Sequence, residues 1–439
     1  MDDLSFARAQ MGLSLAFHIV FAVIGIGVPA LMVASEGMWL RTRDPVYLDL
    51  TRQWARGTAV LFAVGAVSGT VLSFELGLLW PRFMAYAGGI IGMPFSLEGF
   101  AFFTEAIFLG IHLYAWERVR PLVHWLAGVV VAVSGLASAV FVVTANAWMN
   151  SPAGFRVVGG QVVDVDPIAA MLNPAAAQQV VHMVLAAYVA TGFGVAGIHA
   201  FFLLRNRASA FHRRAFAIAL ATGAIAIPLQ VLSGDLIARM VAARQPEKFA
   251  AMEGLYRTQP RAPLTLGGIP HDATMEMRFA VQIPGGLSLL AHHDAEAVVT
   301  GLEAFPRDEW PNVRAVHFGF QVMVAAGMAL LAVAAWGGWL AVRHRRLPDG
   351  RWFLRACVAA TPLGFVAIEA GWIVTEMGRQ PWIIYRVMRT ADAVTPMPGL
   401  VVPFTVFTGV YVLLTVILVL LLRRGFMETS PPRPDRDAA

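Results

Sequence analysis

Residues 353–382 read FLRACVAATPLGFVAIEAGWIVTEMGRQPW, an apolar stretch that ends in the string Glu376-Met-Gly-Arg-Gln-Pro-Trp382. The apolar part is long enough to cross a lipid bilayer as a helix. Glu376, Arg379 and Trp382 stand together where it ends. An ionisable side chain at membrane depth costs a few kcal/mol unless it is paired or has a function. The stretch therefore predicts a transmembrane helix with a functional site at one end.

Pro381 predicts where this helix ends. Proline lacks a backbone N–H and disfavours helical geometry in the residue before it, so the helix should end at Gln380. Glu376 and Arg379 are three residues apart and would face the same side of the last turn. They form either a structural ion pair or a site in which Glu376 binds a ligand. Trp382 would then lie at the membrane interface, where indoles are enriched.

Similar apolar stretches recur along the whole chain of 439 residues. The chain is 58% hydrophobic and 14% charged, with a mean hydropathy of +0.64, which excludes an ordinary soluble globular protein. The first stretch is too long, and its flank too acidic, for a cleaved signal peptide. The sequence therefore predicts an all-α integral membrane protein with nine transmembrane helices. Their expected ranges are 11–40, 55–80, 95–116, 123–148, 179–204, 214–243, 315–342, 353–376 and 399–422.

The arginines predict the orientation of these helices. If the N-terminus is outside, the inner connections hold most of the arginines and the short outer connections hold few. Because basic residues favour the cytoplasmic side, we expect a periplasmic N-terminus and a cytoplasmic C-terminus. The net charge of +5 then reflects orientation, since no basic patch mixed with aromatic residues indicates nucleic acid binding. The inner arginines are Arg41, Arg43, Arg52, Arg56, Arg118, Arg120, Arg205, Arg207, Arg213, Arg214, Arg343, Arg345, Arg346, Arg351, Arg355, Arg423 and Arg424.

The hydrophobic pattern divides the chain into four parts. Helices one to six occupy 1–243, a periplasmic connection 244–312, and helices seven to nine 313–426. A connection of this length is usually functional or disordered. The segment 427–439 is rich in proline and charge and predicts a disordered cytoplasmic tail. Cys357 is the only cysteine, so no disulfide and no thiolate metal site is expected within the chain.

Four side chains that can bind haem iron lie at similar depth in different spans. They are His18, His182, Met323 and Glu376. Imidazole, thioether and carboxylate can all ligate haem iron, and a His/Met pair is a low-spin combination. Each has a plainer interpretation, because a histidine can bond a helix carbonyl, a methionine can fill the core, and Glu376 can pair with Arg379. Their common place in the outer half of the membrane favours ligation.

Glu98 and Glu105 form a second constellation, in the third span. They are seven residues apart, which places them on one face of a helix. Two carboxylates on one face of an apolar helix are costly unless they pass protons, meet a cation or line a water path. The alternative is a structural hydrogen bond to a neighbouring helix.

Several blocks of this chain resemble subunit I of the cytochrome bd quinol oxidases, in the order in which that family has them. The Gly378–Trp382 string is the most specific of them. The resemblance runs from the first span to the ninth. The blocks are Phe6-Ala-Arg-Ala-Gln10 followed by His18, the Glu98–Glu105 segment, Gln179-Val-Val-His182, Lys248–Glu253, Val322-Met323, and Trp372 through Trp382.

The resemblance implies a haem arrangement. His182 and Met323 would ligate a low-spin haem b. His18 and Glu376 would each hold one iron of a second pair, a high-spin haem b together with haem d or a third haem b. The residues beside that pair would be Arg8, Trp372 and Arg379.

The resemblance also implies a reaction, in which quinol is oxidised at the outer connection and oxygen is reduced to water. Lys248 and Glu253 would contact the quinol, although both can also be read as solvated loop charges. Glu98 and Glu105 would serve proton delivery. Because consumed protons would cross from inside, the enzyme would be electrogenic without pumping. Together with Arg379, these two glutamates are the expected catalytic residues.

The expected partners are those of the family: a second, haem-free large subunit, a possible small single-span subunit, ubiquinol or menaquinol, O2, and the bacterial inner membrane. Three features depart from the family pattern. Gln321 replaces an arginine that often precedes the ligating methionine by two residues. Glu98 and Glu105 are seven residues apart, whereas some members have eight. The outer connection is compact, which suggests the short-loop branch, whose cyanide-insensitive members carry haem b in place of haem d.

A competing hypothesis is a secondary transporter that uses buried glutamates as a proton or ion relay. It would use Glu98, Glu105 and Glu376. No inverted repeat supports this hypothesis, and it leaves the His/Met pair without a purpose.

Overall fold

The computed structural model describes residues 2–159 and 161–427, and it is mostly helical. Nine segments within this described part are long and apolar enough to span a membrane. The fold class predicted from the sequence is therefore confirmed. The spanning helices are α1 (Asp3–Thr42), α2 (Pro45–Leu79), α3 (Pro81–Tyr114), α4 (Pro121–Asn150), α6 (Ala176–Arg205), α7 (Ala210–Arg244), α10 (Val313–His344), the pair α11 (Arg351–Ala360) and α12 (Leu363–Arg379), and α14 (Val401–Met427).

Helix boundaries follow local chemistry. Three of the spanning helices begin on proline, at Pro45, Pro81 and Pro121, where the missing N–H would have had no helical partner. The Asp44 carboxylate caps α2 by accepting from the backbone N–H of Val46 at 3.0 Å. These signals lie outside the apolar stretches, so the helices are longer than the stretches that predict them.

The eighth span is two helices instead of the continuous helix predicted over 353–376. It breaks between Ala360 and Leu363. Pro362 lacks the N–H that a continuous helix would need there. As predicted, α12 ends at Arg379 with Gln380 as its C-cap residue.

The long connection folds into a small module, called here the loop module (residues 246–312). It is not disordered. It begins with α8, which packs against α7, α10 and α12, and it then forms three two-stranded antiparallel ribbons, β3–β8, β4–β7 and β5–β6. Its elements are α8 (Pro246–Glu253), β3 (Gln259–Pro260), β4 (Leu264–Leu266), β5 (Ile269–His271), β6 (Glu276–Arg278), β7 (Val281–Ile283), α9 (Gly286–His292), β8 (Val298–Val299), and the 3-10 turns η1 (Leu302–Ala304) and η2 (Arg307–Glu309).

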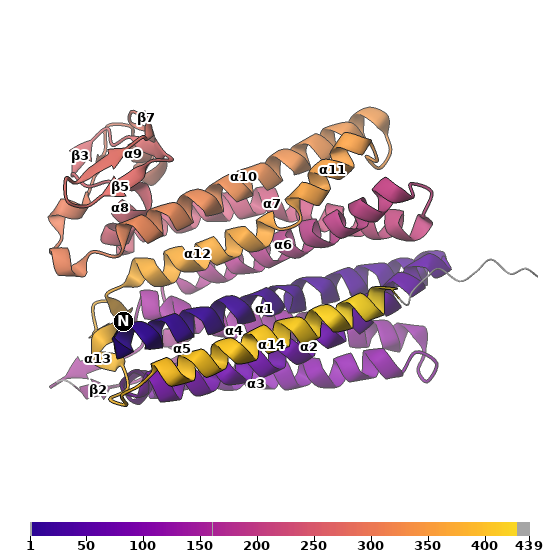
Figure 1. Cartoon of the computed structure of the whole chain (residues 1–439), viewed down its shortest axis with the longest axis horizontal. Helices are drawn as coiled ribbons and strands as arrows, with labels where there is room; N and C mark the ends of the chain where they lie inside the picture. Colours follow the sequence, from indigo (N-terminus) through magenta and orange to yellow (C-terminus); the bar gives the residue numbers. More distant parts are fainter. Residues whose placement is uncertain (1, 160, 428–439) are drawn as a thin grey trace, which may run out of the picture.

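The remaining short elements lie in two other connections: β1 (Arg156–Val158), β2 (Gln161–Val163), α5 (Pro167–Met171), β9 (Trp382–Ile384), β10 (Met388–Arg389) and α13 (Thr390–Ala393). Figure 1 shows the N-terminus, the loop module and α13 at the same end of the helix bundle. The tail predicted at 427–439 lies, apart from Met427, outside the described residues.

Small residues set the helix spacing in the core. A Cβ atom on Gly192 of α6 would lie 2.5 Å from the backbone nitrogen of Gly223 of α7. A Cβ atom on Gly364 of α12 would lie 2.4 Å from the Cα of Ala190 of α6. These contacts bring helix backbones close together, as is typical of membrane bundles. Phe193 and Phe216 fill the space beside them, with no more than 1% of either residue exposed.

We expect Gly192→Ala to destabilise the α6–α7 pair by about 1–3 kcal/mol, the usual cost of overpacking, because the added methyl group meets backbone and not a movable side chain. The measurement is the midpoint of thermal unfolding of the purified protein in detergent. Gly110→Ala in α3 is the matched control, since no heavy atom lies within 4 Å of its added Cβ. An equal loss in both variants would contradict the packing argument.

Candidate functional site

The polar end of α12 is a buried ion pair. Arg379 donates from Nη1 to Glu376 Oε1 at 3.3 Å and from Nη2 to Oε2. The arginine side chain is 2% exposed and the glutamate side chain 26% exposed. The prediction that the two residues share one side of the last turn is therefore confirmed. The carboxylate is the more exposed member of the pair.

Helix α4 and the loop module complete this cluster. Asn146 donates from its amide to Glu376 Oε1 at 2.6 Å. Lys248 of α8 donates from Nζ to Asn150 Oδ1 and to the Thr375 carbonyl, each at 3.2 Å. Gly378 makes room for the lysine, since a Cβ atom there would lie 2.9 Å from Lys248 Cγ and Cε. Lys248 therefore belongs to the Glu376–Arg379 cluster.

Lys248 and Glu253 are not solvated loop charges, so that interpretation is wrong. Both lie in α8, 3% and 4% exposed. Burial, and then the charge of Arg379, lower the pKa of Lys248 to about 7, although Glu376 and Glu247 act in the opposite direction. Burial raises the pKa of Glu253 to about 8, and its Oε2 has no hydrogen-bond partner. Both groups can change protonation near neutral pH.

His18 and His182 are each oriented by a serine from the next helix. His18 Nδ1 lies 2.9 Å from Ser68 Oγ of α2, and His182 Nδ1 lies 3.0 Å from Ser233 Oγ of α7. Each serine hydroxyl donates to a carbonyl of its own helix, Ser68 to Val64 and Ser233 to Gln230. The serine oxygens therefore accept the Nδ1–H protons, which leaves a lone pair on Nε2 of both rings.

A glycine follows each of these two serines. A Cβ atom on Gly69 would lie 3.0 Å from His18 Cε1, and one on Gly234 would lie 3.5 Å from His182 Cε1. At His182 the Gln230 amide nitrogen lies 3.1 Å from Nε2, as expected if that nitrogen accepts. Nε2 with Nδ1–H bonded behind it is the tautomer that binds metal in proteins. The two Ser-Gly pairs were not predicted from the sequence, because their contact with the histidines becomes apparent only in the fold.

Met323 lies where α10 packs against α12. A Cβ atom on Gly371 would lie 3.1 Å from Met323 Sδ, so the glycine keeps the sulfur free of a side chain from α12. Trp372 is half-buried and packs against the cluster of α1 and α6 residues that includes Ile19. Arg8 of α1 reaches the end of α12, with Nη2 3.9 Å from Met377 Sδ.

Glu98 and Glu105 both face α4, as expected for residues seven apart on one helix. Ser138 donates its hydroxyl to Glu98 Oε1 at 3.2 Å. A Cβ atom on Gly135 would lie 3.4 Å from both carboxylate oxygens of Glu105, which is 5% exposed. The hydrogen-bond alternative therefore applies to Glu98, whereas Glu105 lies against a glycine.

Gln321, at the position where the resemblance would place an arginine, forms hydrogen bonds to the loop module. Its amide donates to the Thr265 carbonyl at 3.0 Å, and its Oε1 accepts from the Gly267 N–H at 3.1 Å. The side chain thus fastens the loop module to α10.

Glu75 is a buried carboxylate that the sequence argument missed. It is 1% exposed and accepts at Oε1 from Gln10 at 3.0 Å and Ser14 at 2.9 Å. Tyr411 of α14 donates to Ser14 at 2.8 Å. The signal was available, since Glu75 is an ionisable residue inside a predicted span, as Glu98 and Glu105 are.

Comparisons with known proteins agree with one another. Residues 6–430 match the sequence model of the family described as cytochrome bd terminal oxidase subunit I. A Bacillus subtilis (strain 168) protein, provisionally named cytochrome bd menaquinol oxidase subunit I, is 39% identical over 98% of this chain and 97% of its own length. The cytochrome bd ubiquinol oxidase subunit 1 of the same organism is 30% identical over 97% of this chain and 93% of its own. A solved structure of bd oxidase from Geobacillus thermodenitrificans superimposes with a TM-score of 0.92 at 39% identity, covering 98% of this chain and 99% of that one.

Proposed function

Because this chain belongs to the cytochrome bd terminal oxidase subunit I family, we propose that it is the haem-carrying subunit of a respiratory oxidase that takes electrons from quinol and reduces oxygen to water. Nine apolar helices in the described part of the chain, together with this family membership, make it a multi-pass protein of the bacterial inner membrane. The transporter hypothesis is not favoured, since the whole chain matches an oxidase family.

The observation that carries the proposal is the matched setting of His18 and His182. Each ring has its Nδ1–H bonded to a serine, and each is left with an Nε2 lone pair. This fits iron ligation, because a histidine ligand usually donates its other N–H to a neighbouring group. Haem, when bound, supplies an iron that carries single electrons and binds oxygen.

The proposed haem ligands are those that the family resemblance implies. His182 would pair with Met323 for a low-spin haem b. His18 and Glu376 would each hold one member of a second pair, a high-spin haem b with haem d or a third haem b. Arg379 already neutralises the Glu376 carboxylate. Arg8 and Trp372 would line the same region.

Quinol oxidation is assigned to α8. A carboxylate whose pKa is about 8 can accept a quinol proton and release it, and a nearby ammonium can polarise a quinol oxygen. Glu253 and Lys248 have these chemistries. Glu253 would accept the proton, while Lys248, which contacts α4 and α12, would bind an oxygen atom of the quinol head. Ubiquinol and menaquinol both offer this chemistry, and the relatives named above include an oxidase of each.

Proton supply is assigned to the α3–α4 interface. Glu98 and Glu105 face α4 in a line along α3, and protons would move along it toward the oxygen site. With the N-terminus and loop module outside, the protons consumed come from inside. The reaction would then separate charge across the membrane without pumping.

The apolar surface of the bundle fits partners in the membrane. Large hydrophobic side chains of α14 are exposed, Val402 by 64% and Val412 by 60%, which suits lipid or another membrane subunit. The proposed partners are a haem-free second large subunit and a possible small single-span subunit. The substrates are a quinol and O2.

A visible spectrum and oxygen uptake with quinol test the function together. We expect His182→Ala and Met323→Leu each to remove the same low-spin haem b signal, because a His/Met-ligated iron loses its low-spin state when either ligand is lost. Ser233→Ala should keep the haem and shift its midpoint potential, since only the partner of Nδ1 is removed. An unaltered low-spin spectrum in either ligand variant would show that the pairing is wrong. Extraction of the pigments would distinguish haem d from haem b.

The role of Glu376 can be separated from a structural ion pair by a charge swap. We expect Glu376→Ala to lose haem from the oxygen-reducing pair and Arg379→Ala to weaken haem retention. The double variant Glu376→Arg/Arg379→Glu should not restore either, because a guanidinium cannot bind iron. The measurements are haem content per complex and oxygen uptake. Normal values in the swapped variant would overturn the ligand role.

The role of Glu253 predicts a pH dependence. Since the Glu253 carboxylate must be ionised to accept a proton and Lys248 must be charged to polarise the quinol oxygen, quinol oxidation should rise with pH as Glu253 ionises, reach a maximum between about pH 7 and 8, and then fall as Lys248 loses its charge. Glu253→Gln should remove that rise and slow quinol oxidation by about 10²-fold or more, while activity with an artificial electron donor persists. Glu296→Gln is the control, because that exposed carboxylate only pairs with Arg261. Loss of both activities in Glu253→Gln would indicate misfolding and sink the assignment.

A further inference from the structure

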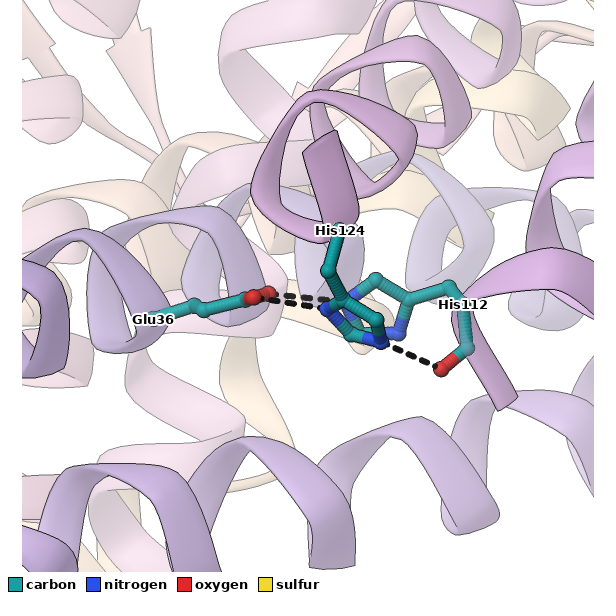
Figure 2. Close-up of side chains that lie close together, drawn as sticks. All are labelled: Glu36, His112 and His124. Carbon is teal, nitrogen blue, oxygen red and sulfur yellow. Dashed lines mark hydrogen bonds and ion pairs between the residues drawn. The ribbon is translucent and has the colours of Figure 1, made fainter. Parts of the chain in front are cut away.

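Three buried side chains meet at the end of the bundle opposite the N-terminus, away from the proposed haem and quinol residues. Glu36 of α1, His112 of α3 and His124 of α4 are 1%, 0% and 2% exposed. Each offers one ligand atom, and these atoms lie within 4.8 Å of one another. Figure 2 shows the two imidazole rings facing the carboxylate. In the part of the chain that the structure describes, this is the only group of three such residues.

Local structure brings the two histidines together. His112 lies in the last turn of α3, and His124 lies in the first turns of α4. The turn between the two helices folds them into an antiparallel hairpin. Gly128, one turn after His124, opens the space for the other ring, since a Cβ atom there would lie 3.1 Å from His112 Nε2. Trp116 in the turn covers the pair, with ring centroids 3.9 Å from His124 and 5.2 Å from His112.

The hydrogen bonds of His124 determine where its lone pair points. Its Nε2 lies 2.9 Å from the carbonyl oxygen of His112. A carbonyl oxygen only accepts, so Nε2 carries the proton. In the neutral ring Nδ1 then holds the lone pair, and Nδ1 lies 2.6 Å from Glu36 Oε1. Two lone pairs cannot face each other at this distance without a cation, so the cluster requires either a metal ion or one extra proton.

His112 supplies a second nitrogen to the same point. Its Nε2 lies 3.0 Å from Glu36 Oε2. Its Nδ1 is buried and makes no hydrogen bond, so without an ion the ring proton lies on Nε2 and is donated to Glu36. A metal ion bound at Nε2 would take the place of that proton and use the Nε2 lone pair. The cluster thus offers two imidazole nitrogens and one carboxylate from three different helices.

From this geometry we propose that Glu36, His112 and His124 bind a divalent transition-metal ion, with zinc as the best match. Two histidines and one glutamate form a known zinc ligand set that leaves a fourth position for water. Ligands about 2.0–2.2 Å from the metal lie roughly 3–4 Å apart, which the side chains reach with small shifts. The bond from His124 Nε2 to a backbone carbonyl is the supporting contact usual for metal-bound histidine.

The ion would join α1, α3 and α4 below the carboxylate face of α3. His112 is seven residues from Glu105, and Glu105 is seven from Glu98, so the three lie on one face of the helix. A metal at His112 would fix the rotation of this face against α4. Its role would be structural, and it would act on Glu98 and Glu105 only through their position.

The test is the metal content of the purified oxidase complex, prepared with a streptavidin-binding tag so that no polyhistidine tag collects metal. Zinc, copper, nickel, cobalt and manganese are counted per complex by mass spectrometry after incubation with zinc and desalting. We expect about one zinc per complex in the unmodified protein and below about a tenth of that in Glu36→Gln and His124→Gln. The thermal midpoint of these variants should fall, while the haem spectrum is retained.

His199→Gln is the matched control. His199 is also a buried histidine and lies against His212, with Nδ1 atoms 2.9 Å apart, but it contacts no carboxylate in the described structure. Its zinc content should equal that of the unmodified protein. If the complexes contain no stoichiometric divalent metal, the proposal is wrong, and the Glu36–His124 contact is instead stabilised by one extra proton. Zinc retained in the Glu36→Gln/His124→Gln double variant would overturn it equally.

If the ligand variants fail to assemble, X-ray absorption at the zinc edge of the unmodified complex decides the question. Imidazole and oxygen neighbours at about 2.0–2.2 Å would support the site. A sulfur neighbour would place the zinc elsewhere and contradict the proposal, because none of the three residues carries sulfur.

Discussion

The hydrocarbon region of a bilayer offers no water to a polar side chain, so buried polar groups are stabilised by partners within the protein, on their own helix or on a neighbouring one. This constraint organises the functional half of the protein. Glu376 is held by Asn146 of α4 as well as by Arg379 of its own helix. His18 and His182 are held by serines of adjacent helices. The helices are consequently locked in rotation by polar contacts, and apolar packing fills the space between them.

The same constraint connects the loop module to the membrane-embedded site. Lys248 is the residue of α8 that enters the bundle, where it meets Asn150 and the Thr375 carbonyl next to Glu376. Gln321 fastens β4 and the following turn to α10. Under the proposed function, the quinol segment and the Glu376 end of α12 are therefore one continuous structure. A displacement of α8 would move the surroundings of Glu376, because Lys248 is hydrogen-bonded to Asn150 and to the carbonyl of Thr375.

Much of this arrangement could be predicted from the sequence, because its causes are local. Apolar length gave the spans, Pro381 gave the end of α12, and a spacing of seven put Glu98 and Glu105 on one face. The burial of Lys248 could not be predicted, since it depends on Gly378 of α12 and on Asn150 of α4, both far away in the sequence. A lysine in a polar segment looks like a solvated charge until the fold supplies its partners.

The two Ser-Gly pairs and the α3–α4 interface depend on contacts between two helices, which the sequence of either helix alone does not predict. Along α3, polar residues stand at every seventh position, at Glu98, Glu105 and His112. They lie against Ser138, Gly135 and Gly128 of α4 in that order, because the two helices are antiparallel. Each polar residue faces either a hydroxyl or a glycine, because an apolar side chain there would clash or leave a polar group without a partner. The pattern becomes visible only when both helices are placed side by side in antiparallel register. Such an interface is therefore identified by polar residues spaced seven apart on one span and small residues at the facing positions of the next span.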